Sequence, residues 1–234
     1  ILSLAGSLPF IFSDTIPSTA IRGNMSLLKI FYKKTSAIKE STEAVYLLAG
    51  LGNPGREYRE TRHNIGFMMI DSFAARHNIK LNKVQNKAIV GVGRVNGVRV
   101  ILAKPQTYMN QSGQAIAGLV RYYKVSLENL IVGHDDVDLP FQTIRIRPAG
   151  GSAGQKGMTS IIEQLGTQNF ARLRMGIGRP PGQMDAAAYV LQTFTKAEKE
   201  MLGSFLDRAV EALQCYLNEG LETAMNRFNP TEKD

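Results

Sequence analysis

Four short polar motifs contain the side chains of this chain that are best suited to chemistry. They are Gly-Asn-Pro-Gly at residues 52–55, Thr-Arg-His-Asn at 61–64, Tyr-Met-Asn at 108–110 and His-Asp-Asp at 134–136. A histidine can take a proton from water, an acid can orient that histidine, and amide groups can hold a carbonyl and its developing negative charge. The motifs therefore indicate cleavage of an acyl bond by water, and neither a serine nucleophile nor a metal cluster competes with that interpretation.

Each of these residues also has an ordinary structural interpretation. Asn53 could be a turn residue, His63 a cap or a surface side chain, and Asn110 a helix cap. Asp135 and Asp136 could bind a metal, but only one further acid lies nearby and no histidines have metal-binding spacing. Because the motifs follow successive predicted strands, a common site is favoured over a set of unrelated turns and caps.

The glycine-rich run at residues 50–55 also fits the fingerprint of dinucleotide-binding folds. It follows a predicted strand, and an acid, Asp71, stands about twenty residues later. However, residues 56–62 separate the last glycine from the next apolar helix, and Asp71 falls inside that helix instead of ending a second strand. We therefore expect no nucleotide cofactor.

The composition limits the class of protein. The 234 residues are 44% hydrophobic, enough for one substantial core, and carry a formal net charge of +8. That charge favours a polyanionic partner such as nucleic acid, although it could also serve only solubility. The single cysteine, Cys215, lies on an apolar helical stripe and is expected to pack in the core. No apolar run approaches the roughly twenty residues of a membrane-spanning helix, so we expect no membrane partner.

The first 44 residues differ from the rest of the chain. They combine an apolar start, a Ser/Thr/Pro-rich stretch and a small excess of basic residues. They could be a targeting peptide, sequence upstream of a start at Met25, or a short amphipathic helix. We expect residues 1–44 to be an N-terminal extension, disordered or peripheral, and residues 45–234 to form one globular catalytic domain.

From Val45 onward, strand and helix signals alternate as in a layered α/β domain. The apolar run at 45–51 predicts a buried strand, and Asn96-Gly97 predicts a tight hairpin between antiparallel strands at 88–92 and 98–103. Further strands are predicted at 130–133, 143–147 and 173–177, and helices at 64–77, 112–124, 158–165 and 196–218, with one or two more turns at 219–226. A mixed sheet with helices around it follows from this order.

Taken together, these motifs closely resemble those of the bacterial-type peptidyl-tRNA hydrolases, which cut the ester between a peptide and the 3′ end of tRNA. The resemblance covers roughly residues 45–229. The residues that carry it are Gly50-Leu51-Gly52-Asn53-Pro54-Gly55, Tyr58, Thr61-Arg62-His63-Asn64-Ile65-Gly66, Pro105-Gln106-Thr107-Tyr108-Met109-Asn110-Gln111-Ser112-Gly113, His134-Asp135-Asp136, Asp138-Leu139-Pro140 and Arg172-Leu173-Arg174-Met175-Gly176-Ile177-Gly178.

The resemblance implies a single α/β domain with a mixed, twisted sheet flanked by helices, no metal, no cofactor and usually a monomer. It implies that His63 is the base that activates water and that Asp135 is its partner. Asn53 and Asn110 would bind the peptide end and assist the reacting carbonyl. The full substrate-binding set that we expect is Asn53, Tyr58, Tyr108, Met109, Asn110 and Lys156.

The basic residues are expected to contact tRNA. Many relatives have His-Asn-Gly where this chain has Gln155-Lys156-Gly157, so a lysine replaces a substrate-binding asparagine, and we expect Lys156 to bind the acceptor end of tRNA. Arg147 and Arg174 stand where the resemblance places phosphate-binding residues, although a solvated strand edge would explain them equally well. The glycine-rich loop at 150–156 could also receive a phosphate.

The expected function is therefore hydrolysis of peptidyl-tRNA, which releases free tRNA for reuse in translation. The expected location is cytoplasmic, or organellar if residues 1–44 are a targeting segment. The alternative is an RNA-binding protein that has kept the fold but lost turnover, as in plant organellar splicing factors of this superfamily. The intact Asn53, His63, Asn110 and Asp135 argue against that alternative.

Overall fold

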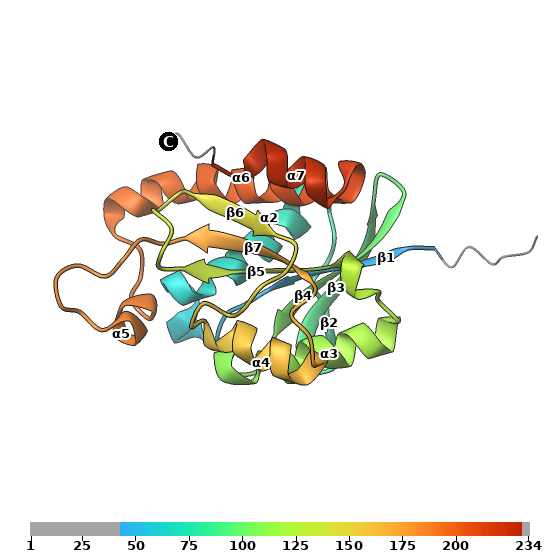
Figure 1. Cartoon of the computed structure of the whole chain (residues 1–234), viewed down its shortest axis with the longest axis horizontal. Coiled ribbons are helices and arrows are strands. Elements are labelled where there is room, and N and C mark those ends of the chain that lie inside the picture. The colour runs from blue at the N-terminus through green and yellow to red at the C-terminus, as the bar shows by residue number, and fades with distance from the viewer. Residues whose placement is uncertain (1–42, 231–234) are drawn as a thin grey trace, which may run out of the picture. The chain divides into compact units, whose positions relative to one another are not determined.

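The computed structural model describes residues 43–230, so almost all of the expected extension at 1–44 lies outside the described residues. The described chain forms a mixed sheet of seven strands in the order β2-β3-β4-β1-β5-β7-β6 (Figure 1). The strands are β1 Val45–Gly50, β2 Lys83–Gln85, β3 Ala88–Val95, β4 Val98–Pro105, β5 Leu130–Asp136, β6 Ile144–Arg147 and β7 Ala171–Gly176.

The four strands β4, β1, β5 and β7 run parallel to one another, whereas β2, β3 and β6 pair antiparallel to their neighbours. The carboxyl ends of β1, β5 and β7 consequently meet at one edge of the sheet. In open sheets of this kind, that edge is where ligands usually bind. The predicted class, an α/β domain with a mixed sheet, is confirmed.

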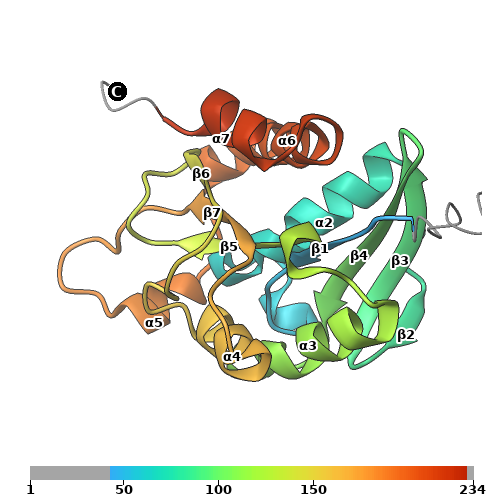
Figure 2. The same ribbon diagram turned by 45° about the vertical axis from the view of Figure 1, so that its right-hand side comes forward.

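Helices cover both faces of the sheet (Figure 2). The helices α2, α6 and α7 pack on one face and α3 and α4 on the other, each with its own cluster of buried apolar side chains. Their bounds are α2 Ile65–Arg76, α3 Ser112–Tyr123, α4 Lys156–Leu165, α6 Lys196–Glu219 and α7 Leu221–Phe228, with a short α5 at Ala186–Val190. In the described part of the chain, no helix is long and apolar enough to cross a membrane.

The predicted hairpin is confirmed. Val95 pairs with Val98, and the two residues between them have positive φ, 49° at Asn96 and 84° at Gly97. Asparagine and glycine tolerate this left-handed conformation best, which is why the pair marks a tight turn. The prediction that Cys215 packs in the core is also confirmed, because the side chain is buried in α6.

Two elements were not predicted, and the strands β3, β4 and β5 extend beyond their predicted ends at 92, 103 and 133. Strand β2 has three residues, and α5 follows a Pro/Gly-rich stretch, so neither is long enough to show a clear period. Strand β5 was expected to stop at Gly133, but its pairing with β7 continues to Asp136 opposite Gly176. The polar side chains of residues 134–136 therefore lie inside the strand, because the parallel ladder outlasts the apolar run.

A close contact between two glycines positions the start of α2. A Cβ atom at Gly50 would lie 2.0 Å from the carbonyl oxygen of Gly66. A Cβ atom at Gly66 would in turn lie 2.4 Å from the backbone nitrogen of Leu51 and 2.5 Å from the carbonyl oxygen of Gly133. The first turn of α2 thus lies directly against β1 and β5, which brings the residues just before it to the end of β5.

Candidate active site

His63 and Asp135 form a close pair at the carboxyl edge of the sheet. His63 lies in the 3₁₀ turn η2, Arg62–Asn64, and Asp135 lies on β5. His63 Nδ1 is 2.8 Å from Asp135 Oδ2, and the two side chains are 12% and 3% exposed. A carboxylate that accepts from Nδ1–H leaves Nε2 with its lone pair, so Nε2 is the nitrogen that can accept a proton.

Gln155, which our reasoning from sequence did not assign to the site, holds the other oxygen of Asp135. The backbone N–H of Met158 donates to Gln155 Oε1 at 2.7 Å, which makes Gln155 the N-cap of α4. Because Oε1 faces this donor, Nε2 faces Asp135 Oδ1, at 3.1 Å. A glutamine just before a helix indicates a cap at most, so only the fold reveals the contact with Asp135.

Asn53 joins two of the motifs. The side chain of Asn64 accepts from Asn53 N–H and donates to Asn53 C=O, both at 2.9 Å. Asn53 Oδ1 accepts the backbone N–H of Met109 at 2.8 Å. Within residues 43–230 no group hydrogen-bonds Asn53 Nδ2, so this amide nitrogen is available to donate to a bound carbonyl.

The Tyr-Met-Asn motif forms the 3₁₀ turn η3, Met109–Gln111, with its N-cap at Tyr108. Met109 is buried, and its sulfur lies 3.2 Å from Gln155 Nε2. Tyr108 and Asn110 are exposed, which leaves both side chains open to a substrate. Hydrogen bonds thus connect Asn53, Met109, Gln155, Asp135 and His63 in an unbroken series.

Within residues 43–230, the two remaining predicted substrate-binding residues take no part in this series of hydrogen bonds. Tyr58 is half-buried in the 3₁₀ turn η1, Arg56–Tyr58, and its carbonyl oxygen accepts from the N–H and the hydroxyl of Thr61. Lys156 is the exposed first residue of α4, next to Gln155. It therefore presents a positive charge at a helix N-terminus that itself favours anions.

A buried arginine anchors the turn that carries His63. Arg62 is 3% exposed, donates to the carbonyl oxygen of Thr193, and binds Glu198 Oε2 at 2.7 Å. Its guanidinium also lies over the ring of Tyr189, at 4.5 Å from the ring centre. Arg62 is adjacent to His63, so these contacts fix the backbone from which the imidazole projects.

His134 is unsuited to act as a base, although it neighbours Asp135. It is 2% exposed, and its Nδ1 donates to the carbonyl oxygen of Asp135 at 2.8 Å. Burial lowers the pKa of His134 below the usual value of histidine, so its ring stays neutral. The two histidines therefore differ in burial and in their partners, since His63 contacts the Asp135 carboxylate and His134 a backbone carbonyl.

The predicted RNA-binding arginines differ in their surroundings. Arg147 is exposed at the end of β6, whereas Arg174 on β7 is half-buried and pairs through Nε with Asp136. A third arginine, Arg172, is buried and donates to the carbonyl oxygens of Gly150 and Gly151. Arg172 thus fastens the glycine-rich loop that precedes α4, a role that the sequence did not indicate.

The geometry provides an orientated imidazole, a buried carboxylate held on both oxygens and free amide groups. In the described residues, no group of three or more His, Cys, Asp or Glu side chains is arranged to hold a metal ion. These groups suit attack by water on a carbonyl, in which the imidazole takes the proton and the amides stabilise the oxyanion.

Comparisons with known proteins point to one family. Residues 47–234 match a family model described as peptidyl-tRNA hydrolase. The chain is 50% identical over 187 residues to the peptidyl-tRNA hydrolase of Chloroflexus aurantiacus, which spans 80% of this chain and 100% of that protein. It is 45% identical over 185 residues to the chloroplastic peptidyl-tRNA hydrolase of Arabidopsis thaliana, which spans 79% of this chain and 64% of that one.

A solved structure is also similar to this chain. The crystal structure of peptidyl-tRNA hydrolase from Acinetobacter baumannii has a TM-score of 0.75 and 34% sequence identity. The superposition covers 80% of this chain and 95% of that one. The TM-score and the coverage show that the two chains share this fold.

Proposed function

This chain belongs to the peptidyl-tRNA hydrolase family and hydrolyses peptidyl-tRNA, and we propose that its His63–Asp135 pair activates the attacking water. The observation that supports this assignment is the 2.8 Å contact between His63 Nδ1 and Asp135 Oδ2. It leaves Nε2 as the acceptor for a water proton, and the Asp135 carboxylate stabilises the imidazolium that forms.

The amides are proposed to bind the reacting carbonyl. As water attacks, negative charge builds on the carbonyl oxygen, and Asn53 Nδ2 and the Asn110 amide can donate to it. The tetrahedral intermediate then collapses, and its bond to the 3′ oxygen of the terminal ribose breaks. That oxygen takes a proton from the imidazolium. The products are a peptide with a free carboxylate and a tRNA with a free 3′ hydroxyl.

We propose that Tyr58, Tyr108 and Met109 complete the substrate-binding surface on the peptide side. Lys156 is proposed to bind the acceptor end of tRNA, because an exposed ammonium at a helix N-terminus suits a phosphate. The arginines Arg147 and Arg174 are proposed to contact tRNA phosphates further from the ester. Such contacts read backbone and shape, which suits an enzyme that acts on many tRNAs.

Two features of the whole protein also remain proposals. We infer that it acts as a monomer, because all the groups of the proposed mechanism come from one chain. We propose a cytoplasmic location, with an organelle as the alternative, since one similar protein is named as chloroplastic. The alternative of a catalytically silent RNA-binding protein is not favoured, because the relatives of this chain are named as hydrolases and the proposed catalytic pair is intact.

The decisive experiment measures release of free tRNA from an N-acetylated aminoacyl-tRNA. We expect His63→Ala to lower kcat by about a hundredfold or more, because the general base is lost. His77→Ala is the matched control, since His77 lies at the end of α2 and bonds Gln214. A wild-type protein that binds this substrate without turnover, or a His63→Ala variant with full activity, would contradict the proposal.

A further inference from the structure

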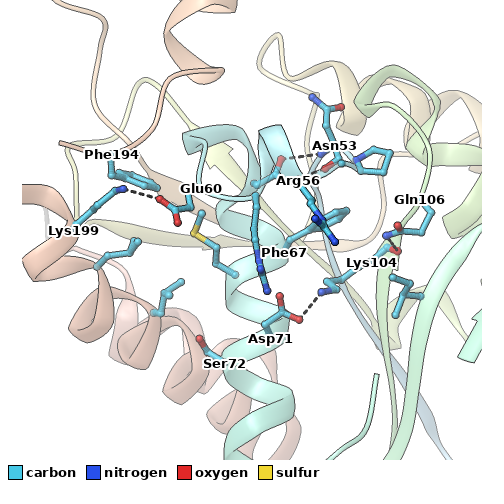
Figure 3. Close-up of a pocket in the computed structure, with 18 residues that line it drawn as sticks. Asn53, Arg56, Glu60, Phe67, Asp71, Ser72, Lys104, Gln106, Phe194 and Lys199 are labelled. Carbon is cyan, nitrogen blue, oxygen red and sulfur yellow. Dashed lines mark hydrogen bonds and ion pairs between the residues drawn. The ribbon is translucent and has the colours of Figure 1, made fainter. Parts of the chain in front are cut away.

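A hollow of about 840 Å³ lies beside the catalytic edge, on the face of the sheet covered by α2 and α6. Its walls come from the loop after β1, from η1, α2 and α6, and from the end of β4. Figure 3 shows two ion pairs in this hollow, Glu60 with Lys199 and Asp71 with Lys104, and Phe67 beside the second of them. Neither His63 nor Asp135 lines this hollow, so it is separate from the catalytic pair.

The hollow carries an excess of positive charge. Both acidic residues that line the hollow already form ion pairs with lysines. Glu60 Oε2 lies 2.7 Å from Lys199 Nζ, and Asp71 Oδ1 lies 2.5 Å from Lys104 Nζ. The two remaining charged residues, Arg56 and Arg59, are exposed and form no ion pair with any acid in residues 43–230. Their guanidinium groups are therefore available to bind carboxylates in two-pronged geometry.

The hollow also offers apolar surface. Phe67, Phe194 and Leu202 line it, and the Lys104 ammonium lies over the Phe67 ring, 5.7 Å from its centre. The Lys104 side chain is only 15% exposed, so it belongs to the floor of the hollow. A hollow that combines aromatic and aliphatic surface with charged groups suits a flexible ligand that has both kinds of group.

The sheet order places this hollow opposite the proposed RNA-binding residues. Lys104 lies near the end of β4, on one side of β1 and β5, whereas Arg174 and Arg147 lie on β7 and β6, on the other side. The catalytic pair lies between them, at the carboxyl end of β5. A substrate with its tRNA over β7 and β6 therefore extends its peptide toward β4.

One loop forms a shared boundary between the hollow and the catalytic edge. Asn53, Pro54 and Gly55 line the hollow, while Asn53 Oδ1 accepts from the turn that carries Asn110. A peptide chain held at Asn53 needs only to cross this loop to reach Arg56 and Arg59. We propose that the hollow binds the peptide of peptidyl-tRNA beyond the residues next to the ester, and that it favours acidic side chains there.

This inference rests on the proposed function, and it is tested with a pair of substrates. The two peptidyl-tRNAs share the tRNA and the residues next to the ester, and differ in carrying glutamates or lysines further along the peptide. For the wild-type protein we expect kcat/KM to be about three- to tenfold higher with the glutamate peptide, as expected for two exposed ion pairs. The double variant Arg56→Glu, Arg59→Glu should reverse the preference.

Two controls separate the possible outcomes. Arg121→Glu changes an exposed arginine on α3, on the other face of the sheet, and should leave the preference as in the wild type. N-acetylated aminoacyl-tRNA, which cannot reach the hollow, reports the catalytic step alone. Equal rates for both peptides in the wild type would overturn the inference. An equal effect of the double variant on every substrate would also overturn it, because it would indicate that Arg56 and Arg59 contact RNA. A wild type that fails to cleave even the short substrate would instead refute the proposed function.

Discussion

At the scale of single residues, the site depends on how one carboxylate is held. Asp135 has a donor on each oxygen, His63 on one and Gln155 on the other. Hydrogen bonds to a carboxylate stabilise its charge, and two of them also fix the plane of the group. We therefore propose that Gln155 is a positioning residue, which keeps Oδ2 in line with the imidazole.

Replacement of Gln155 should separate this role from its role as a helix cap. Serine is a good N-cap but too short to reach Asp135, so Gln155→Ser should keep the stability of the protein and lose the contact. We expect kcat for N-acetylated aminoacyl-tRNA to fall about tenfold, as for loss of one hydrogen bond to a charged group.

Two further variants serve as controls for Gln155→Ser. Gln155→Leu loses the helix cap as well as the contact with Asp135, and Gln155→His has a ring that can again donate to Asp135. The leucine variant should also lose about 1 kcal/mol of unfolding free energy, measured by urea denaturation. The histidine variant should regain much of the rate. A serine variant with the wild-type kcat would show that Gln155 serves only as a cap.

At the scale of elements, the helices α3 and α4 lie unusually close together. A Cβ atom at Gly113 would lie 2.0 Å from the carbonyl oxygen of Ser160, and the N–H of Gly113 donates to the Ser160 hydroxyl at 3.1 Å. These two helices begin at Ser112 and Lys156. Their approach therefore brings η3, with Asn110, next to the loop that carries Gln155.

Gly113→Ala should consequently separate the two helices. We expect a loss of about 2–3 kcal/mol in the free energy of unfolding, because the backbone must move to relieve the overlap. Gly203→Ala is the matched control, since Gly203 lies in α6 with no atom within 4 Å of its added Cβ. That control should gain about 0.5–1 kcal/mol from helix propensity. Equal effects of the two variants in urea denaturation would contradict this interpretation of the helix contact.

Helix α6 is coupled to the catalytic turn through Glu198. Burial alone would raise the pKa of Glu198, but hydrogen bonds from Thr195 and the charge of Arg62 hold it below the usual value. Because the pKa of Glu198 is lower in the folded protein, its carboxylate stabilises the fold at pH values above the pKa of the unfolded state. This stabilisation is lost as the pH falls through the pKa of the folded state. The anchor of the turn that carries His63 should therefore weaken in acid.

Glu198→Gln tests this coupling, since glutamine keeps the shape and cannot ionise. At neutral pH we expect the variant to be less stable than the wild type by about 1–2 kcal/mol. This difference should shrink as the pH falls below the ordinary pKa of glutamate, about 4.3, and vanish as the pH passes through the lower pKa of Glu198 in the folded protein. Urea denaturation at several pH values measures it, and a difference that stays constant with pH would refute the role of the Glu198 charge.

Elements with a local sequence signal could be predicted, whereas contacts between distant segments could not. The helices α2 and α3 and the hairpin at Asn96 are found within a few residues of their predicted bounds, because period and turn chemistry are local signals. The meeting of His63 with Asp135 was inferred from motifs, and the structure shows the contact. The bonds made by Gln155, Arg62 and Arg172 link segments far apart in the chain, so no local pattern could indicate them.

At the scale of the whole molecule, the net charge of +8 meets a polyanionic substrate. Each phosphate that the protein neutralises releases counterions, so substrate binding should weaken steadily as salt rises. Arg147 and Lys156 are both exposed, at the end of β6 and at the start of α4. Arg174 already pairs with Asp136, so its contribution to this dependence should be smaller.

We expect log KM for N-acetylated aminoacyl-tRNA to rise linearly with log salt concentration while kcat changes little. Arg147→Gln and Lys156→Asn should each reduce the slope by about one, as expected for loss of one phosphate contact. Arg121→Gln, an exposed arginine on α3, controls for the change in net charge and should leave the slope unchanged. If all three variants change the slope equally, the salt dependence reflects only the net charge of the protein. That result would mean that neither Arg147 nor Lys156 binds a phosphate. If Lys156→Asn alone keeps both the slope and the rate of the wild type, the lysine has no part in holding the acceptor end.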